Sequence, residues 1–114
     1  MSRARGLDLQ NALAAWLRVH GWPHAESAGS GRNGTDVTGT PGIVWENKTA
    51  REFSPLAFVR QAKVSAQIAG GHRLVPVVVY WPVGVGDTRA DFTLAIVPLG
   101  RLAALLREAG YGDE

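Results

Sequence analysis

The chain has 114 residues, 46% of them hydrophobic, and contains no cysteine. This length predicts a single domain over residues 1–114 with one core, and the lack of cysteine excludes disulfides and thiolate metal sites. No apolar run reaches the length of a membrane span and the N-terminus has no signal-peptide core, so we expect a cytoplasmic protein without membrane association.

The net charge of +2 is unevenly distributed. Residues 1–86 carry nine Lys or Arg against five Asp or Glu, whereas Glu108, Asp113 and Glu114 lie at the C-terminal end. The surface built from the first part should therefore be more basic than the total charge implies, as a nucleic-acid partner requires. An ordinary charged surface is the alternative.

Residues 7–20 predict an amphipathic first helix that ends at Gly21. Its apolar stripe consists of Leu9, Leu13, Trp16 and Leu17. Gln10 lies at the edge of this stripe and faces either the solvent or the hairpin expected at residues 34–48. Residues 22–25 then predict a short first strand.

Residues 27–34, SAGSGRNG, predict a glycine-rich loop that carries Arg32. The loop lacks the lysine pattern of a Walker motif, which excludes a nucleotide cofactor at this position. It either covers a phosphate backbone or serves as a plain connector.

Residues 34–48 predict two short strands joined by a type II turn, in which Pro41 and Gly42 take the central positions. Folding about that turn brings Asp36 level with Glu46. Because side chains alternate along a strand, Glu46 and Lys48 share one face with Val44, while Asn47 points the other way. Two carboxylates and an ammonium group are thus expected on one surface.

Residues 54–69 predict a second helix, with Ser54 as N-cap and Pro55 at the first position. Its expected packing face is made of Val59, Ala62, Ala66 and Ala69. Gln61 and Ser65 share a polar face of the same helix.

Residues 74–81 form a near-continuous apolar run, which predicts a central strand buried on both faces. Residues 92–96 alternate as a half-buried strand nearer the edge, and residues 99–109 predict a last helix. The apolar side of that helix contains Leu102, Leu105, Leu106 and Ala109. The expected fold is a mixed α/β domain with the order helix, three strands, helix, two strands, helix.

The predicted charge cluster suggests a metal site. Two neighbouring carboxylates repel each other unless a cation lies between them, and their hard oxygen ligands suit Mg²⁺ or Mn²⁺. A lysine beside the metal can position a water or stabilise charge on a phosphate. Asp36, Glu46 and Lys48 therefore predict metal-assisted hydrolysis of a phosphodiester.

The chain resembles the PD-(D/E)XK nuclease superfamily, whose fold is the restriction-endonuclease-like αβββαβ core with a central mixed sheet flanked by helices. The resemblance rests on the element order, on Asp36, on the triplet Glu46-Asn47-Lys48 and on Gln61 in the following helix. The RGLDLQ start, the strand spacing and the short length are most similar to archaeal-type Holliday junction resolvases and to small resolvase-like phage nucleases.

The resemblance implies a role for each of these residues. Asp36 and Glu46 would be metal ligands with the carbonyl of Asn47, and Lys48 would orient the attacking water. Gln61 would either support these groups from behind or orient substrate. Many such resolvases carry a glutamate on the first helix where this chain has Gln10, and an amide binds a hard cation less strongly. A second metal ion is therefore in question.

We expect a metal-dependent DNA endonuclease that acts on branched DNA, most specifically a Holliday junction. Sequence-independent phosphate contacts are expected from Arg32, Arg51, Arg60 and Lys63. Two symmetric cuts imply a C₂ homodimer, with the apolar strand or the last helix as its interface. The alternatives are a nicking, exonucleolytic or restriction-type nuclease, a non-catalytic nucleic-acid-binding module, and a small structural protein in which the charged cluster is incidental.

Overall fold

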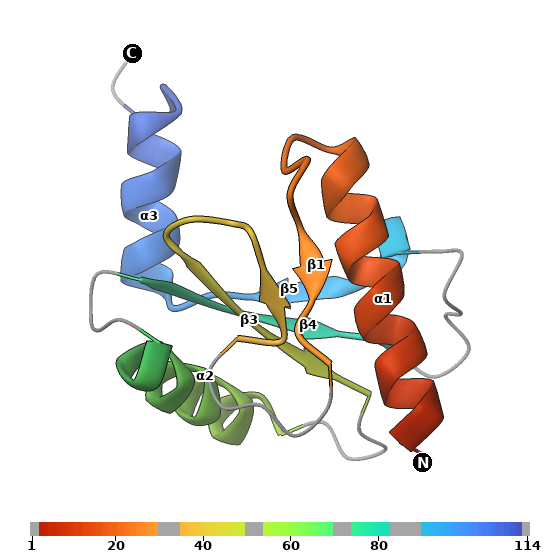
Figure 1. Cartoon of the computed structure of the whole chain (residues 1–114). Helices are drawn as coiled ribbons and strands as arrows, with labels where there is room; N and C mark the ends of the chain where they lie inside the picture. Colours follow the sequence, from red (N-terminus) through yellow and green to blue (C-terminus); the bar gives the residue numbers. More distant parts are fainter. Residues whose placement is uncertain (1–2, 30–34, 50–53, 70–73, 83–89, 113–114) are drawn as a thin grey trace.

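The computed structural model describes residues 3–29, 35–49, 54–69, 74–82 and 90–112. The elements follow the predicted order of helix, three strands, helix, two strands and helix (Figure 1). They are α1 (Arg3–Val19), β1 (Glu26–Ser27), β2 (Val37–Thr38), β3 (Ile43–Lys48), α2 (Pro55–Ala69), β4 (Val75–Tyr80), the 3₁₀ turn η1 (Ala90–Phe92), β5 (Leu94–Ile96) and α3 (Leu99–Glu108).

The main sheet has three strands in the order β3-β4-β5. β3 and β4 are parallel, with Glu46 beside Val78 and Lys48 beside Tyr80, whereas β4 and β5 are antiparallel. Parallel neighbours need a crossover connection, and α2 provides it between β3 and β4. β4 is therefore the central strand, as its apolar run predicts.

A helix covers each face of this sheet (Figure 1). On one face, Trp45 and Val79 pack with Leu9, Leu13 and other residues of α1 in the larger core cluster. On the other face, a smaller cluster joins α2 to the sheet through Phe58, Ala62, Val78 and Tyr80. The period-two alternation of β3 therefore directs Trp45 toward α1 and Glu46 toward α2.

The predicted strand at residues 22–25 is wrong. This segment is a turn after α1, in which the Trp22 N–H donates to the Leu17 carbonyl and the Ala25 N–H donates to the Trp22 carbonyl, both at 3.0 Å. The backbone groups that a ladder would use are thus occupied by local bonds. The strand begins at Glu26 and has two residues.

The predicted pairing of the two strands within residues 34–48 is also wrong, because β2 pairs with β1 in a separate antiparallel sheet. The turn itself is confirmed: the Ile43 N–H donates to the Thr40 carbonyl at 3.2 Å, and Gly42 has a φ of 86°. A backbone bond of 2.8 Å from the Asp36 N–H to the Trp45 carbonyl still brings the two segments together.

α2 and β5 form as predicted, with differences in the buried residues of α2 and in the first residue of β5. α2 buries Phe58 and Ser65 in addition to the predicted Ala62 and Ala66. β5 starts later than expected, because the Thr93 N–H and hydroxyl both bond to the Ala90 carbonyl in the 3₁₀ turn. β5 lies at the sheet edge, as predicted.

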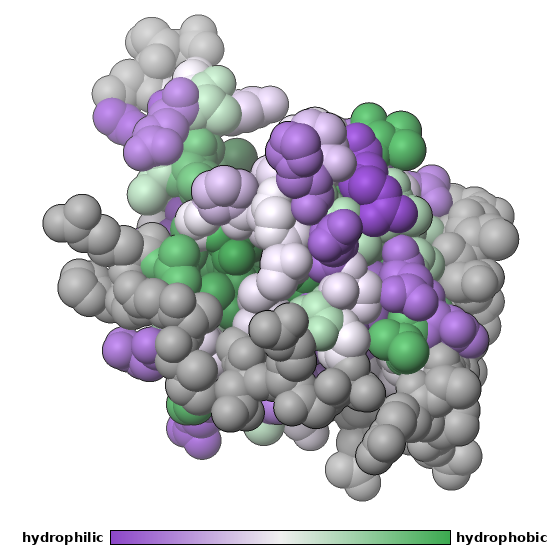
Figure 2. Space-filling model, in the orientation of Figure 1, coloured by the Kyte–Doolittle hydropathy of each residue, from purple (hydrophilic) through white to green (hydrophobic). Residues whose placement is uncertain are grey.

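The last helix forms as predicted, but its packing differs from that of the other two helices. The structure describes the whole of α3, and none of its residues is buried. Its leucines instead contribute to hydrophobic surface around α3 (Figure 2).

Within the part of the chain that the structure describes, no helix has the length and apolar content needed to cross a membrane.

Candidate functional site

The predicted catalytic residues gather where the second half of β3 meets α2 and the segment before β2. Asp36 precedes β2, Glu46 and Lys48 belong to β3, and Gln61 lies on α2. Side-chain hydrogen bonds link these elements directly. These bonds agree with the expectation from the sequence that the four residues lie near one another.

Both the side chain and the backbone of Asp36 are hydrogen-bonded to β3. Its Oδ2 accepts a 2.7 Å hydrogen bond from the Asn47 N–H, and its own N–H donates to the Trp45 carbonyl. Burial raises the pKa of Asp36 above its ordinary value, while the Asn47 N–H and the charge of Lys48 act in the opposite direction. The carboxylate is thus held in place although its desolvation favours the neutral acid.

Glu46 is 6% exposed, and its Oε1 accepts a hydrogen bond from the Ser65 hydroxyl of α2. Burial raises the pKa of Glu46; Ser65 opposes this effect, the negative charge of Asp36 adds to it, and Lys48 opposes it. The effect of Asp36 on Glu46 means that the two carboxylates repel each other. A cation between them would relieve this repulsion.

Lys48 is positioned from α2. Its Nζ donates a 2.5 Å hydrogen bond to Oε1 of Gln61 and lies 5.8 Å from the centre of the Phe58 ring. The amide and the aromatic face restrict the position of a flexible side chain. Gln61 therefore contacts Lys48, which agrees with the first of its two expected roles, support of the catalytic groups.

The side chain and the main-chain carbonyl of Asn47 point in different directions. Its side-chain Oδ1 accepts a 2.5 Å bond from the Trp81 indole, on the sheet face opposite Glu46. The Trp45 carbonyl points toward Asp36, and the Lys48 carbonyl points toward Trp81, which directly follows β4. Because carbonyl directions alternate along a strand, the Asn47 carbonyl points to the Asp36 edge. This direction agrees with the expected use of the carbonyl rather than the side chain.

Ser65 belongs to the site although it was not among the predicted site residues. It is buried and its hydroxyl is the hydrogen-bond donor to Glu46. The sequence contained a usable signal, since Ser65 is four residues after Gln61 and therefore lies on the same face of α2.

Gln10 is buried, and its amide nitrogen donates to the Ser27 hydroxyl at 3.0 Å and to the Gly29 carbonyl at 3.2 Å. The neighbouring Ala28 N–H donates to the Asp36 carbonyl at 2.9 Å. Through Ser27 and Gly29, Gln10 thus fixes the segment whose backbone is hydrogen-bonded to Asp36. The solvated glutamine that the sequence left open is excluded.

The predicted phosphate-binding residues divide into two groups. Arg32 and Arg51 lie outside the described residues. Arg60 and Lys63 are exposed on α2, with Lys63 on the side of the helix that faces the start of α3.

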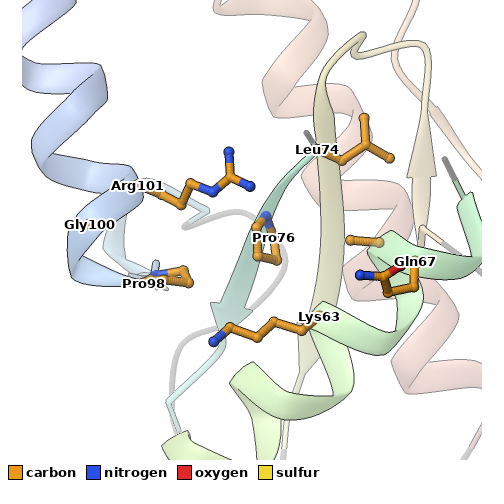
Figure 3. Close-up of a pocket in the computed structure, with 8 residues that line it drawn as sticks. Lys63, Gln67, Leu74, Pro76, Pro98, Gly100 and Arg101 are labelled. Atoms are coloured by element: carbon orange, nitrogen blue, oxygen red, sulfur yellow. The ribbon is translucent and has the colours of Figure 1, made fainter. Parts of the chain in front are cut away.

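A cavity of about 400 Å³ lies between α2, β4 and the start of α3, where Lys63 and Arg101 border apolar residues such as Pro76 (Figure 3). The described residues that line it do not include Asp36, Glu46 or Lys48. The cavity is therefore separate from the carboxylates.

The donor set around Asp36 and Glu46 fits one hard divalent cation. Mg²⁺ is commonly bound through one or two carboxylates and keeps several waters for substrate phosphates. Two carboxylates, a main-chain carbonyl directed to the same edge and mutual carboxylate repulsion meet that need. Within the described ranges there is no group of three or more His, Cys, Asp or Glu side chains that could hold a metal. The side chains alone thus offer two ligands.

No family model, no curated protein and no solved structure matches this chain.

Proposed function

We propose that this protein is a metal-dependent DNA endonuclease of the PD-(D/E)XK type that acts on branched DNA, with a Holliday junction as the favoured substrate. The observation that carries the proposal is the link between β3 and α2, in which Glu46 is bound by Ser65 and Lys48 is bound by Gln61 beside a tethered Asp36. The element order from α1 to β4 supports the αβββαβ core of that superfamily.

The chain's residues divide the chemical work. Asp36, Glu46 and the Asn47 carbonyl would hold Mg²⁺ or Mn²⁺, which supplies Lewis-acid activation of water and phosphate when bound. Lys48 orients the attacking water, and Gln61 fixes the lysine. In-line attack breaks the bond to the 3′ oxygen and leaves a 5′-phosphate and a 3′-hydroxyl.

DNA affinity would come from sequence-independent phosphate contacts. Arg60 and Lys63 extend from the exposed side of α2, the helix that also carries Gln61. We assign phosphate contacts to Arg32 and Arg51 as well, because each is close in the sequence to a site residue, Asp36 or Lys48. Paired cuts on a junction require two such sites, which we expect in a C₂ homodimer.

The first experiment uses a labelled four-way DNA junction, a nicked duplex and a linear duplex, each with Mg²⁺, Mn²⁺ or EDTA. We expect metal-dependent paired nicks on the junction that are lost in Asp36→Asn. Asp8→Asn is the matched control, because Asp8 is an exposed carboxylate on α1 outside the site. Cutting of linear DNA alone would keep the nuclease and remove the junction specificity.

Lys48→Ala should lower the cleavage rate by at least about a hundredfold, because an oriented general base or water-positioning group contributes a factor of this size. Junction binding should stay within about twofold, since Lys48 is engaged with Gln61 and is one charge among several. Binding is measured by fluorescence anisotropy and cleavage by single-turnover gel assays. Retained cleavage would refute the assigned role of Lys48.

A non-catalytic nucleic-acid-binding module is the second candidate, favoured by the engagement of Gln10 in structural bonds with Ser27 and Gly29. Junction binding that is independent of divalent metal, with no cleavage of any substrate by the folded protein, would select this function.

A further inference from the structure

We infer that α3 is a self-association surface, on which the helix packs antiparallel against α3 of a second copy of this chain. Both faces of the sheet are already covered by α1 and α2, which leaves α3 as the helix whose apolar side is uncovered. The inference gives the dimer of the proposed nuclease its interface. It is tested by molecular mass, so it can fail independently of the cleavage chemistry.

The first observation is exposed apolar surface. The leucines at positions 99, 102, 105 and 106 recur at spacings of three and four residues and form one stripe along α3. Their exposed fractions are 78% for Leu99, 38% for Leu102, 44% for Leu105 and 41% for Leu106. A ten-residue helix is marginal in water without tertiary packing, so this stripe needs a covering surface.

The second observation is that the charges beside the stripe complement a copy of themselves. Arg101 and Glu108 are seven residues apart and lie on one flank of the leucines. In an antiparallel pair with its two-fold axis between residues 104 and 105, like flanks meet. Arg101 then lies opposite Glu108 of the partner subunit, and the symmetry repeats this contact.

The same axis matches the apolar ends of the helix. Leu99, which is 78% exposed, lies at the level of Gly110 of the partner subunit, one residue before Tyr111, which is 68% exposed. In a parallel pair opposite flanks would meet, so Arg101 would not reach Glu108 of the partner subunit, and the helix dipoles would align unfavourably. The charge pattern therefore selects an antiparallel second copy as the occupant.

The test is analytical ultracentrifugation of the full chain from micromolar to near-millimolar concentration. Wild-type protein should shift from monomer to dimer over this range, and Leu106→Glu should remain monomeric throughout. Val19→Glu is the matched control, because Val19 is an 80% exposed apolar residue on α1. A wild-type monomer at every concentration, or a dimer unaffected by Leu106→Glu, would overturn the inference.

The register is tested by charge exchange. Glu108→Arg should weaken dimerisation about threefold to tenfold, because it places like charges opposite each other at two symmetric contacts. Arg101 also interacts within its own chain, so the decisive comparison is the Arg101→Glu and Glu108→Arg double variant. Recovery to within about twofold of wild type supports the antiparallel register. A double variant no tighter than Glu108→Arg alone refutes it.

Discussion

The carboxylates of Asp36 and Glu46 are stabilised as anions by few groups and destabilised by burial. The Asn47 N–H and the Ser65 hydroxyl donate one hydrogen bond to each, and Lys48 lowers both pKa values. Desolvation is nevertheless the largest influence, and it raises both pKa values. Such a site stores unfavourable electrostatic energy that a bound cation would release.

This energy predicts a pH dependence of stability. The pKa of Asp36 is higher in the folded chain than in the unfolded chain, so the folded state binds a proton more readily. Stability is then greatest below the unfolded pKa and is lost as the pH rises through the folded pKa. Asp36→Asn should therefore raise the free energy of unfolding at pH 7, by on the order of 1 kcal/mol, and the gain should vanish near pH 3. Urea unfolding at both pH values measures it.

Mg²⁺ provides the complementary measurement. At ten times its dissociation constant, the ion should stabilise the wild-type protein by about 1.4 kcal/mol, which is several degrees in Tm for a chain of this size. Asp36→Asn should lose this response and Asp8→Asn should keep it. An equal Mg²⁺ response in Asp36→Asn would show that Asp36 is not a ligand.

At the scale of elements, the segment from β1 to β3 depends on two glycines in different surroundings. Gly39 has a φ of 80°, and a Cβ built on it would lie 1.9 Å from the His24 carbonyl oxygen. Gly42 has a similar φ of 86°, but nothing lies within 4 Å of its Cβ position. Substituting Gly42 therefore tests the backbone strain of a positive φ alone, whereas substituting Gly39 tests that strain together with a steric clash.

Gly42→Ala should destabilise the protein by about 1 kcal/mol, because a positive φ is strained for any residue with a Cβ. Gly39→Ala adds a collision between backbone atoms and should cost more than about 3 kcal/mol. Thermal unfolding followed by circular dichroism compares the two variants. Equal losses would mean that the turn after α1 can move away from β2.

At the scale of the whole molecule, α2 connects the site to the proposed DNA surface. Gln61 faces Lys48, while Arg60 and Lys63 are exposed on the same helix. Each phosphate contact releases about one counterion, so replacing both Arg60 and Lys63 by Ala should reduce the slope of log K against log salt by about 1.8. Anisotropy titrations over a salt series test this. An unchanged slope would exclude this part of α2 from the DNA surface.

The packing of α3 could not be predicted from its sequence. Leu102, Leu105 and Leu106 have the spacing of a buried helix face, and the structure leaves them partly exposed. Periodicity shows that a helix has an apolar side, but the position of that side relative to the body depends on where β5 and the connection before α3 direct the chain. For Ser65 the sequence shows only that it shares a helix face with Gln61; its hydrogen bond to Glu46, 19 residues away in the sequence, depends on how α2 packs on β3.

The sequence by itself determined the element order, the central position of β4 and the turn at Pro41 and Gly42. These features depend on local properties, namely apolar periodicity, strand alternation and turn residues such as Pro41 and Gly42, which act over a few residues. Only the tertiary structure decided that β2 pairs with β1, that Gln10 braces the segment before Asp36 and that α3 leaves its leucines uncovered. Those outcomes depend on competition between distant segments for the same backbone groups and the same apolar surface. The local sequence pattern does not show which segment wins that competition.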